Sequence, residues 1–195
     1  MSDGNLFDAA RRWVVEQYPY NSNHLLNTLE WLDRFAPDSR EAVRLAALTH
    51  DMERAFPGPD QPVMTTLTDP EYNRLHSERS ARIVSGWFRE HGAEPELVGD
   101  IGALVLAHEV GGWPEANLVQ AADSISFLDA NVELALNFVR TGRFTGPQVR
   151  AKLDYSYNRI QVSAVHDLAW PYLQRARARL AELAPETASA DDIER

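Results

Sequence analysis

Apolar residues recur at intervals of three and four along most of this chain, and this spacing limits the possible fold more than any other feature. Such intervals place side chains on one face of an α-helix, whereas a half-buried β-strand needs apolar and polar residues in alternation. We find no convincing run of alternation in the sequence. The sequence therefore predicts an all-α fold, a bundle of about seven to eight helices.

Proline, glycine and capping residues mark the expected ends of these helices. Asp69 followed by Pro70 is typical of a helix start, and Gly92 is typical of a helix end. Three prolines within residues 57–62 predict an irregular loop that reaches about residue 69. The expected helices cover residues 6–17, 22–35, 39–56, 70–91, 95–109, 115–139, 147–160 and 163–183.

A chain of 195 residues can bury one substantial core and does not require a second domain. We expect one helical domain over residues 1–184 and a flexible polar tail over residues 185–195. The sequence shows neither an apolar run of membrane-spanning length nor a secretory leader, so we expect a cytoplasmic protein.

The charge and the cysteine content exclude several classes of function. A net charge of −10 argues against binding to nucleic acid polymers or anionic membranes, because both attract basic faces. The absence of cysteine excludes disulfides, thiolate metal sites and cysteine nucleophiles. Any bound metal must therefore be held by nitrogen and oxygen atoms.

Five segments carry a potential metal ligand within a predicted helix or at its end. In chain order, these ligands are His24, the doublet His50-Asp51, His76, His108 and Asp123. The intervals are long enough for the chain to leave one helix and return on a neighbour. Imidazole and carboxylate ligands together select divalent manganese, iron, cobalt, nickel or zinc, whereas magnesium prefers more oxygen ligands. We expect one or two such ions as the cofactor.

This ordered series resembles that of the HD superfamily of metal-dependent phosphohydrolases, over about Tyr20 to Asp129. A histidine lies in the helix before the doublet, and the segment Ala121-Ala122-Asp123 ends the series, as in that family. The two intervening histidines are similar to those of the subset that binds two metals. The resemblance implies a single HD-type helical domain with one ion held by His24, His50, Asp51 and Asp123, and a second held by His76 and His108, with Asp51 bridging both.

The resemblance further implies hydrolysis of a phosphate ester or anhydride, with a nucleotide or another small phosphorylated metabolite as substrate. Metal-activated hydroxide would attack phosphorus, with Asp51 and Arg54 as the catalytic residues. We expect substrate contacts from Arg54, Arg79, Tyr155 and Arg159, because guanidinium groups bind phosphate in a fork and aromatic rings stack on bases. We leave open whether the protein forms a homodimer.

Two other functions stay open on the same ligands. Some proteins with these six ligands hold two irons and use oxygen, and a non-catalytic module could bind a nucleotide through the metal site. The sequence departs from two hydrolase groups, because no lysine follows the doublet closely and a GYP motif is absent. We interpret His91 as structural and the second doublet His166-Asp167 as incidental. Glu109 is either a surface carboxylate, which we slightly prefer, or an acid in the outer shell of the second metal.

Overall fold

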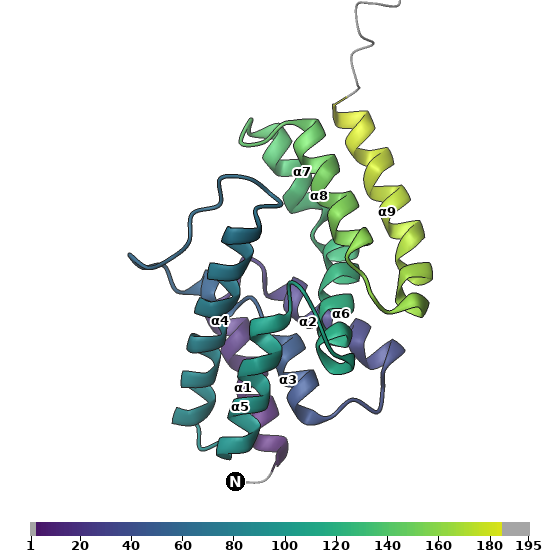
Figure 1. Ribbon diagram of the computed structural model, residues 1–195. Helices are drawn as coiled ribbons and strands as arrows, with labels where there is room; N and C mark the ends of the chain where they lie inside the picture. The colour runs from purple at the N-terminus through teal and green to yellow at the C-terminus, as the bar shows by residue number, and fades with distance from the viewer. Residues whose placement is uncertain (1–2, 185–195) are drawn as a thin grey trace, which may run out of the picture.

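The computed structural model describes residues 3–184, and helices supply all the regular secondary structure in that range (Figure 1). This confirms the predicted all-α class. The elements are α1 (Asp3–Gln17), α2 (Ser22–Phe35), α3 (Glu41–Thr49), the 3-10 helix η1 (Met52–Ala55), α4 (Pro70–Glu90), α5 (Pro95–Ala107), α6 (Pro114–Ala130), α7 (Val132–Arg140), α8 (Gly146–Asn158) and α9 (Ser163–Leu183). The predicted tail at 185–195 lies outside the described residues.

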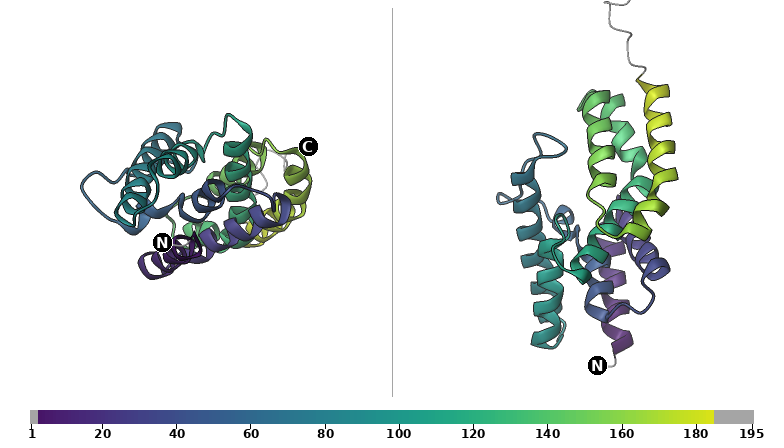
Figure 2. Two further views of the ribbon diagram at one scale, coloured as in Figure 1. Left: turned by 90° about the horizontal axis from the view of Figure 1, so that it is seen from below. Right: turned by 45° about the vertical axis from the view of Figure 1, so that its right-hand side comes forward.

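Two groups of buried apolar side chains form the core, and α6 contributes to both. The first group joins α1 to α5 with the start of α6, and Val119 and Ala122 belong to it. The second group joins the rest of α6 with α7, α8 and α9, and it includes Ile125 and Leu128. In the views of Figures 1 and 2, α4 and α5 lie on one side of α6, and α8 and α9 lie on the other. α6 is thus the element that both halves share.

The predicted start and end signals of α4 are confirmed. The Asp69 side chain accepts a hydrogen bond from the backbone N–H of Glu71 at 2.9 Å, and Pro70 occupies the first turn, where a missing N–H costs nothing. Gly92 follows the helix end with φ of 77°, a conformation that glycine adopts without steric strain. α4 runs unbroken between these two signals.

Two predicted helices are each interrupted, which corrects their expected extents. The helix expected over 115–139 ends at Ala130 and restarts at Val132, because Asn131 leaves helical geometry with φ of −99° and ψ of 7°. The helix expected over 39–56 ends at Thr49, and a 3-10 turn follows the His50-Asp51 doublet. Asparagine is a weak helix former, and its side chain competes for backbone hydrogen bonds. Both interruptions lie beside the site described below.

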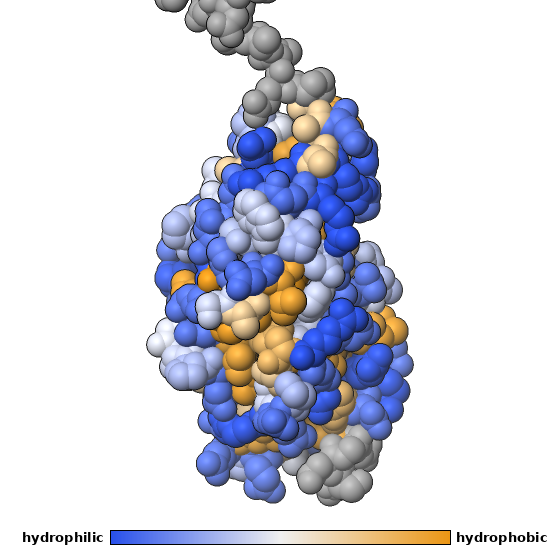
Figure 3. Space-filling model, turned by 90° about the vertical axis from the view of Figure 1, so that its right-hand side faces the viewer, coloured by the Kyte–Doolittle hydropathy of each residue, from blue (hydrophilic) through white to orange (hydrophobic). Residues whose placement is uncertain are grey.

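The outer surface carries scattered apolar residues. One face shows a group of hydrophobic residues in its lower half, bordered by hydrophilic ones (Figure 3). Within the described part of the chain, no helix is both long and apolar enough to cross a membrane.

Candidate metal centre

The six predicted ligands meet at one buried place, although they come from five parts of the chain. Two of them lie within helices on facing sides, His76 in α4 and Asp123 in α6, and His24 lies in the first turn of α2. The others follow a helix end directly, which places the doublet after α3 and His108 after α5. All six side chains are buried: His24, His50, Asp51, His76, His108 and Asp123.

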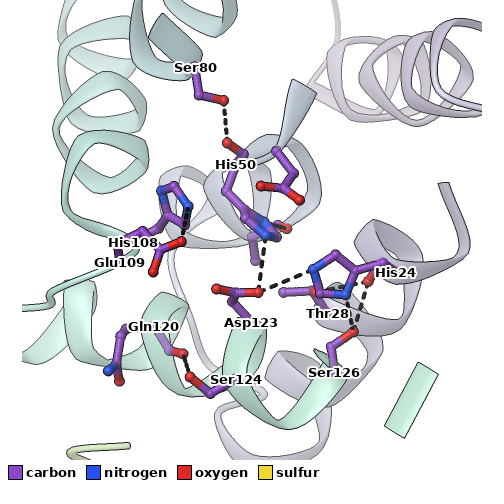
Figure 4. Close-up of polar contacts among 12 residues, drawn as sticks. His24, Thr28, His50, Ser80, His108, Glu109, Gln120, Asp123, Ser124 and Ser126 are labelled. Atoms are coloured by element: carbon purple, nitrogen blue, oxygen red, sulfur yellow. Dashed lines mark hydrogen bonds and ion pairs between the residues drawn. The ribbon is translucent and has the colours of Figure 1, made fainter. Parts of the chain in front are cut away.

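Asp123 binds two of the histidines through one carboxylate oxygen. Its Oδ1 lies 3.2 Å from His24 Nε2 and 3.4 Å from His50 Nε2 (Figure 4). The Ser80 hydroxyl donates a hydrogen bond to the backbone carbonyl of His50, and this bond helps to hold the doublet in place. These contacts bring α2, α3 and α6 together around one point.

Asp51 and the other two histidines continue the cluster. Asp51 Oδ1 lies 2.9 Å from His76 Nε2, and the His108 ring lies between the rings of His50 and His76, with centroid separations of 5.0 and 5.2 Å. The cluster therefore extends from His24 to His76 as a continuous series of rings and carboxylates. Sequence spacing predicted the members of this series but not their order in space.

All four imidazoles are oriented by a hydrogen bond at Nδ1. His24 Nδ1 lies 2.9 Å from the Ser126 hydroxyl, which itself donates to the carbonyl of His24 and must therefore accept from the ring. The other three face acceptors at Ala47 O, Glu53 Oε1 and Val105 O, at 2.9, 2.9 and 2.6 Å. A neutral ring held in this way carries its proton on Nδ1 and its lone pair on Nε2.

The four Nε2 atoms consequently point into the cluster as potential ligands. Those of His50, His76 and His108 are buried without a hydrogen-bond partner among the described residues. Those of His50 and His76 instead face carboxylate oxygens of Asp123 and Asp51, and nitrogen and oxygen atoms that converge on one buried place suit a cation. Three sets have ligand atoms within 4.8 Å of one another: His24, His50 and Asp123; His50, Asp51 and His108; and His76, His108 and Glu109. The residues therefore fit a divalent transition metal.

Glu109 is a member of the cluster, a position that the sequence had indicated only as the less favoured of two interpretations. The preferred interpretation, a surface carboxylate, is wrong, because Glu109 is buried and its Oε1 lies 3.9 Å from His108 Nε2 (Figure 4). The chain turns sharply just after it at Gly111 and Gly112, which have φ of 70° and 126°. A Cβ on Gly111 would lie 2.3 Å from the Asn117 side chain. No pattern in the sequence shows that this turn directs Glu109 inward.

Two arginines neutralise the carboxylates from the cavity side. Arg54 Nε lies 3.1 Å from Asp51 Oδ2, and Arg159 pairs with both Asp123 and Glu109. Burial opposes ionisation of Asp51, but Arg54 and His76 outweigh it and hold its pKa well below the usual value. Burial likewise opposes the ionisation of Glu109, whose pKa Arg159 and Lys152 nonetheless lower to about 2. The carboxylates are thus ionised and available as ligands.

The histidines differ in their affinity for protons. Burial disfavours the charged form of His50, but Asp123 and Asp51 more than compensate and raise its pKa to about 8. Burial and the neighbouring His50 lower the pKa of His108 to about 4. His108 is therefore neutral near pH 7 in the metal-free protein, whereas a metal must displace a proton from His50.

Arg79 lies outside this cluster, although it was predicted to contact phosphate. Its guanidinium donates to the side chain and the backbone carbonyl of Glu53, both at 2.9 Å, and also to Asp60 at 3.1 Å. Glu53 in turn accepts from His76, so Arg79 supports a ligand through one intermediate residue. The Glu53 side chain is buried, with 1% of its surface exposed. Its role was missed because 23 positions separate it from His76 in the chain.

A cavity that opens to solvent lies beside the cluster, with about 90 Å³ of space that the centre of a water molecule can occupy. Arg54 and Arg159 line it, as do His24, Asp51 and Asp123. Tyr155 stands behind this lining, where its hydroxyl accepts a hydrogen bond from Asn73 at 3.3 Å. Lys152 also lines the cavity, although the sequence offered no specific role for it.

The remaining histidines lie elsewhere. His91 stacks on Trp87 with a centroid separation of 3.8 Å and contacts the Trp87 carbonyl through Nδ1. His166 contacts the Tyr157 hydroxyl at 2.9 Å. Neither takes part in the metal-ligand sets found among residues 3–184. This agrees with interpreting His91 as structural and the second doublet as incidental.

The fold and the cluster together define an all-helical protein with a buried site for divalent metal. Comparison with protein families matches the HD domain over residues 21–128, which is more than half of the 195-residue chain. The chain therefore belongs to the HD domain family, as the order of its ligands had indicated. Comparisons with curated proteins and with solved structures gave no match.

Proposed function

We propose that this protein is a metal-dependent hydrolase of phosphate esters or anhydrides, acting on a nucleotide or another small phosphorylated metabolite. The observation that carries the proposal is the orientation of the four histidines. Each is held at Nδ1 and directs Nε2 toward the carboxylates of Asp51, Asp123 or Glu109. Family membership and the cavity that opens beside the cluster support the same conclusion.

The ligand sets support two ions. His24, His50 and Asp123 would hold one, and His76 and His108 the other, with Asp51 or Glu109 adding a carboxylate oxygen. When bound, such ions lower the pKa of coordinated water toward neutrality and neutralise phosphoryl oxygens. A separation of about 4 Å between two ions is usual for phosphoryl hydrolysis.

The residues of the chain itself supply orientation and charge balance. Arg54 binds one oxygen of Asp51 and leaves the other directed toward His76. Arg159 does the same for Asp123, whose second oxygen faces His24 and His50. Because both arginines also line the cavity, they lie within reach of a bound phosphate as well.

The test is phosphate release by the purified protein loaded with manganese, with oxygen excluded. We expect turnover of a generic aryl phosphate, and we expect Asp51→Asn to lower both bound metal and turnover by about a hundredfold or more. Asp167→Asn, in the incidental second doublet, is the matched control and should change neither quantity.

Oxygen uptake by the iron-loaded protein, with no phosphate release under manganese, would instead establish the oxygenase alternative. Tight nucleotide binding without turnover under any metal would establish the non-catalytic alternative. Full metal content in Asp51→Asn would contradict the assignment of the site itself.

A further inference from the structure

The cavity beside the metal cluster has two chemically different ends. Its inner end carries the metal ligands and the paired arginines described above. The rest of its lining includes the amides of Asn73 and Asn131, and an apolar wall from the loop before α4, the end of α6 and α7: Met64, Leu67, Phe127, Leu134, Ala135 and Phe138. The break at Asn131 turns α7 so that its residues line this wall. A ligand that fills the cavity meets charge at one end and hydrocarbon at the other.

Lys152 lines the same cavity and makes no salt bridge within the described residues, although its charge helps to lower the pKa of Glu109. It is the only lysine in the sequence. Its Nζ lies over the rings of Phe127 and Tyr155, at 5.4 and 5.2 Å from their centroids. Among residues 3–184 no carboxylate lies within 4.0 Å of it, whereas the cavity arginines are both paired. Lys152 is therefore the cavity cation left available to a ligand.

Ser156, one turn further along α8, is a second unpaired group in the same wall. Its side chain is fully buried, lines the cavity, and has no hydrogen-bond partner for Oγ within the described residues. Positions four apart lie on the same face of a helix, so Lys152 and Ser156 present an ammonium and a hydroxyl together. An ammonium and a hydroxyl donor side by side suit the oxygen atoms of an anion.

Burying a polar group without a partner costs free energy, unless a ligand supplies the partner. An ammonium removed from bulk water loses solvation that aromatic faces restore only in part. An anion at this position would restore it, and the nearest protein carboxylate of the cluster, Glu109, is already engaged by Arg159. The apolar outer wall would in turn leave the hydroxyls of a sugar without partners, whereas it buries a hydrocarbon group favourably.

We propose that Lys152 and Ser156 bind the phosphate of a small organophosphate whose organic group is aromatic or aliphatic and lies against the α6–α7 wall. This inference rests on the proposed hydrolase function, because it names the substrate class of the same site. It also narrows that function, since polar sugar phosphates and inorganic polyphosphates would be poor ligands.

Two phosphonates that cannot be hydrolysed test the proposal by calorimetry on the full chain. Phenylphosphonate should bind the manganese-loaded protein about tenfold more tightly than methylphosphonate, because only its ring contacts the apolar wall. Lys152→Met should weaken both ligands about tenfold, and Ser156→Ala should weaken both about threefold. Leu134→Ser, a change at a partly exposed wall position, should weaken phenylphosphonate alone.

The charge-matched control is Arg89→Met, at an exposed position near the end of α4, and it should bind both ligands as the wild type does. Equal affinity for the two phosphonates would overturn the apolar assignment. Unchanged binding in Lys152→Met would overturn the role of that residue. If circular dichroism shows that Lys152→Met is unfolded, Lys152→Gln replaces it under the same criteria.

Repeating the titration without metal separates this inference from the proposed function. The Lys152 effect should persist there, because the ammonium is not a metal ligand. If the binding pattern is as predicted but no metal supports phosphate release, the hydrolase proposal is wrong and the proposed ligand class is kept. Phosphate release from aryl and sugar phosphates at similar kcat/KM would sink the ligand class alone.

Discussion

The HD-matched region, residues 21–128, and the three helices that follow it contribute differently to one site. Every predicted metal ligand lies in the matched region, on α2, α4 and α6 or just after α3 and α5. α7, α8 and α9 contribute no ligand to the sets found in the described residues. α7 supplies part of the apolar wall, and the cavity cations Lys152 and Arg159 lie in α8 and directly after it. The difference separates the residues that could hold metal from those that we propose select the ligand.

The shared helix α6 connects these two contributions. Val119 and Ala122 pack into the core of the matched region, whereas Ile125 and Leu128 pack against α7 to α9. Asp123 lies between them in sequence and contacts a histidine on one side and Arg159 on the other. A change at Asp123 should therefore affect both parts, and a change at Lys152 should affect one.

The largest expected effect follows from that contrast. Asp123→Asn should lower the affinity for metal by about a hundredfold or more, because a neutral amide replaces the charged oxygen shared by two histidines. Lys152→Met should keep the full metal content and lose only ligand affinity. Elemental analysis of both variants, side by side, measures this. Loss of metal in Lys152→Met would contradict the separation between the metal ligands and the cavity cation.

A smaller effect is expected from Glu53, which orients a ligand without touching the site. Glu53→Gln should weaken metal binding by about ten- to a hundredfold, because an amide is a poorer acceptor for the Nδ1–H of His76 and removes one of the two carboxylates paired with Arg79. The matched control is Glu133→Gln, an exposed carboxylate of α7. Metal affinity and thermal unfolding, measured together, distinguish loss of orientation from loss of the fold. Unchanged affinity in Glu53→Gln would exclude this orienting role.

The sequence predicted the matched region better than the part that follows it. The ligands were recognisable because their order resembles that of the HD family, and because each lies within a helix or directly after one, where the chain returns to the same point. The residues that complete the site were not. Glu109 is turned inward by the Gly111-Gly112 turn, and Glu53 meets His76 only after α4 packs against η1. Such contacts depend on tertiary packing, which local spacing does not encode.

The cavity was harder to predict still. Its wall depends on the break at Asn131, where the apolar periodicity continues and predicts one uninterrupted helix. Lys152 gave no sign of its role, because a single lysine on a helix is most often solvated. Arg79 shows the reverse error, since an arginine three residues after a ligand was expected to face the site and instead binds Glu53 and Asp60.

The smallest expected effect is a dependence of metal binding on pH, which sharpens the account of the matched region. Because the pKa of His50 is raised to about 8 in the folded protein, its second proton stabilises the metal-free form below about pH 6.5, and this stabilisation is lost as pH rises through 8. A metal ion needs the ring deprotonated, so its affinity should rise about tenfold for each unit between pH 6.5 and 8. His108, with a pKa near 4, is already neutral there and should not contribute to the pH dependence.

Manganese titrations in buffers of different ionisation enthalpy would count the protons released. About one proton per protein at pH 7 agrees with displacement at His50, whereas no release across this range would show that the ring is neutral before the ion binds.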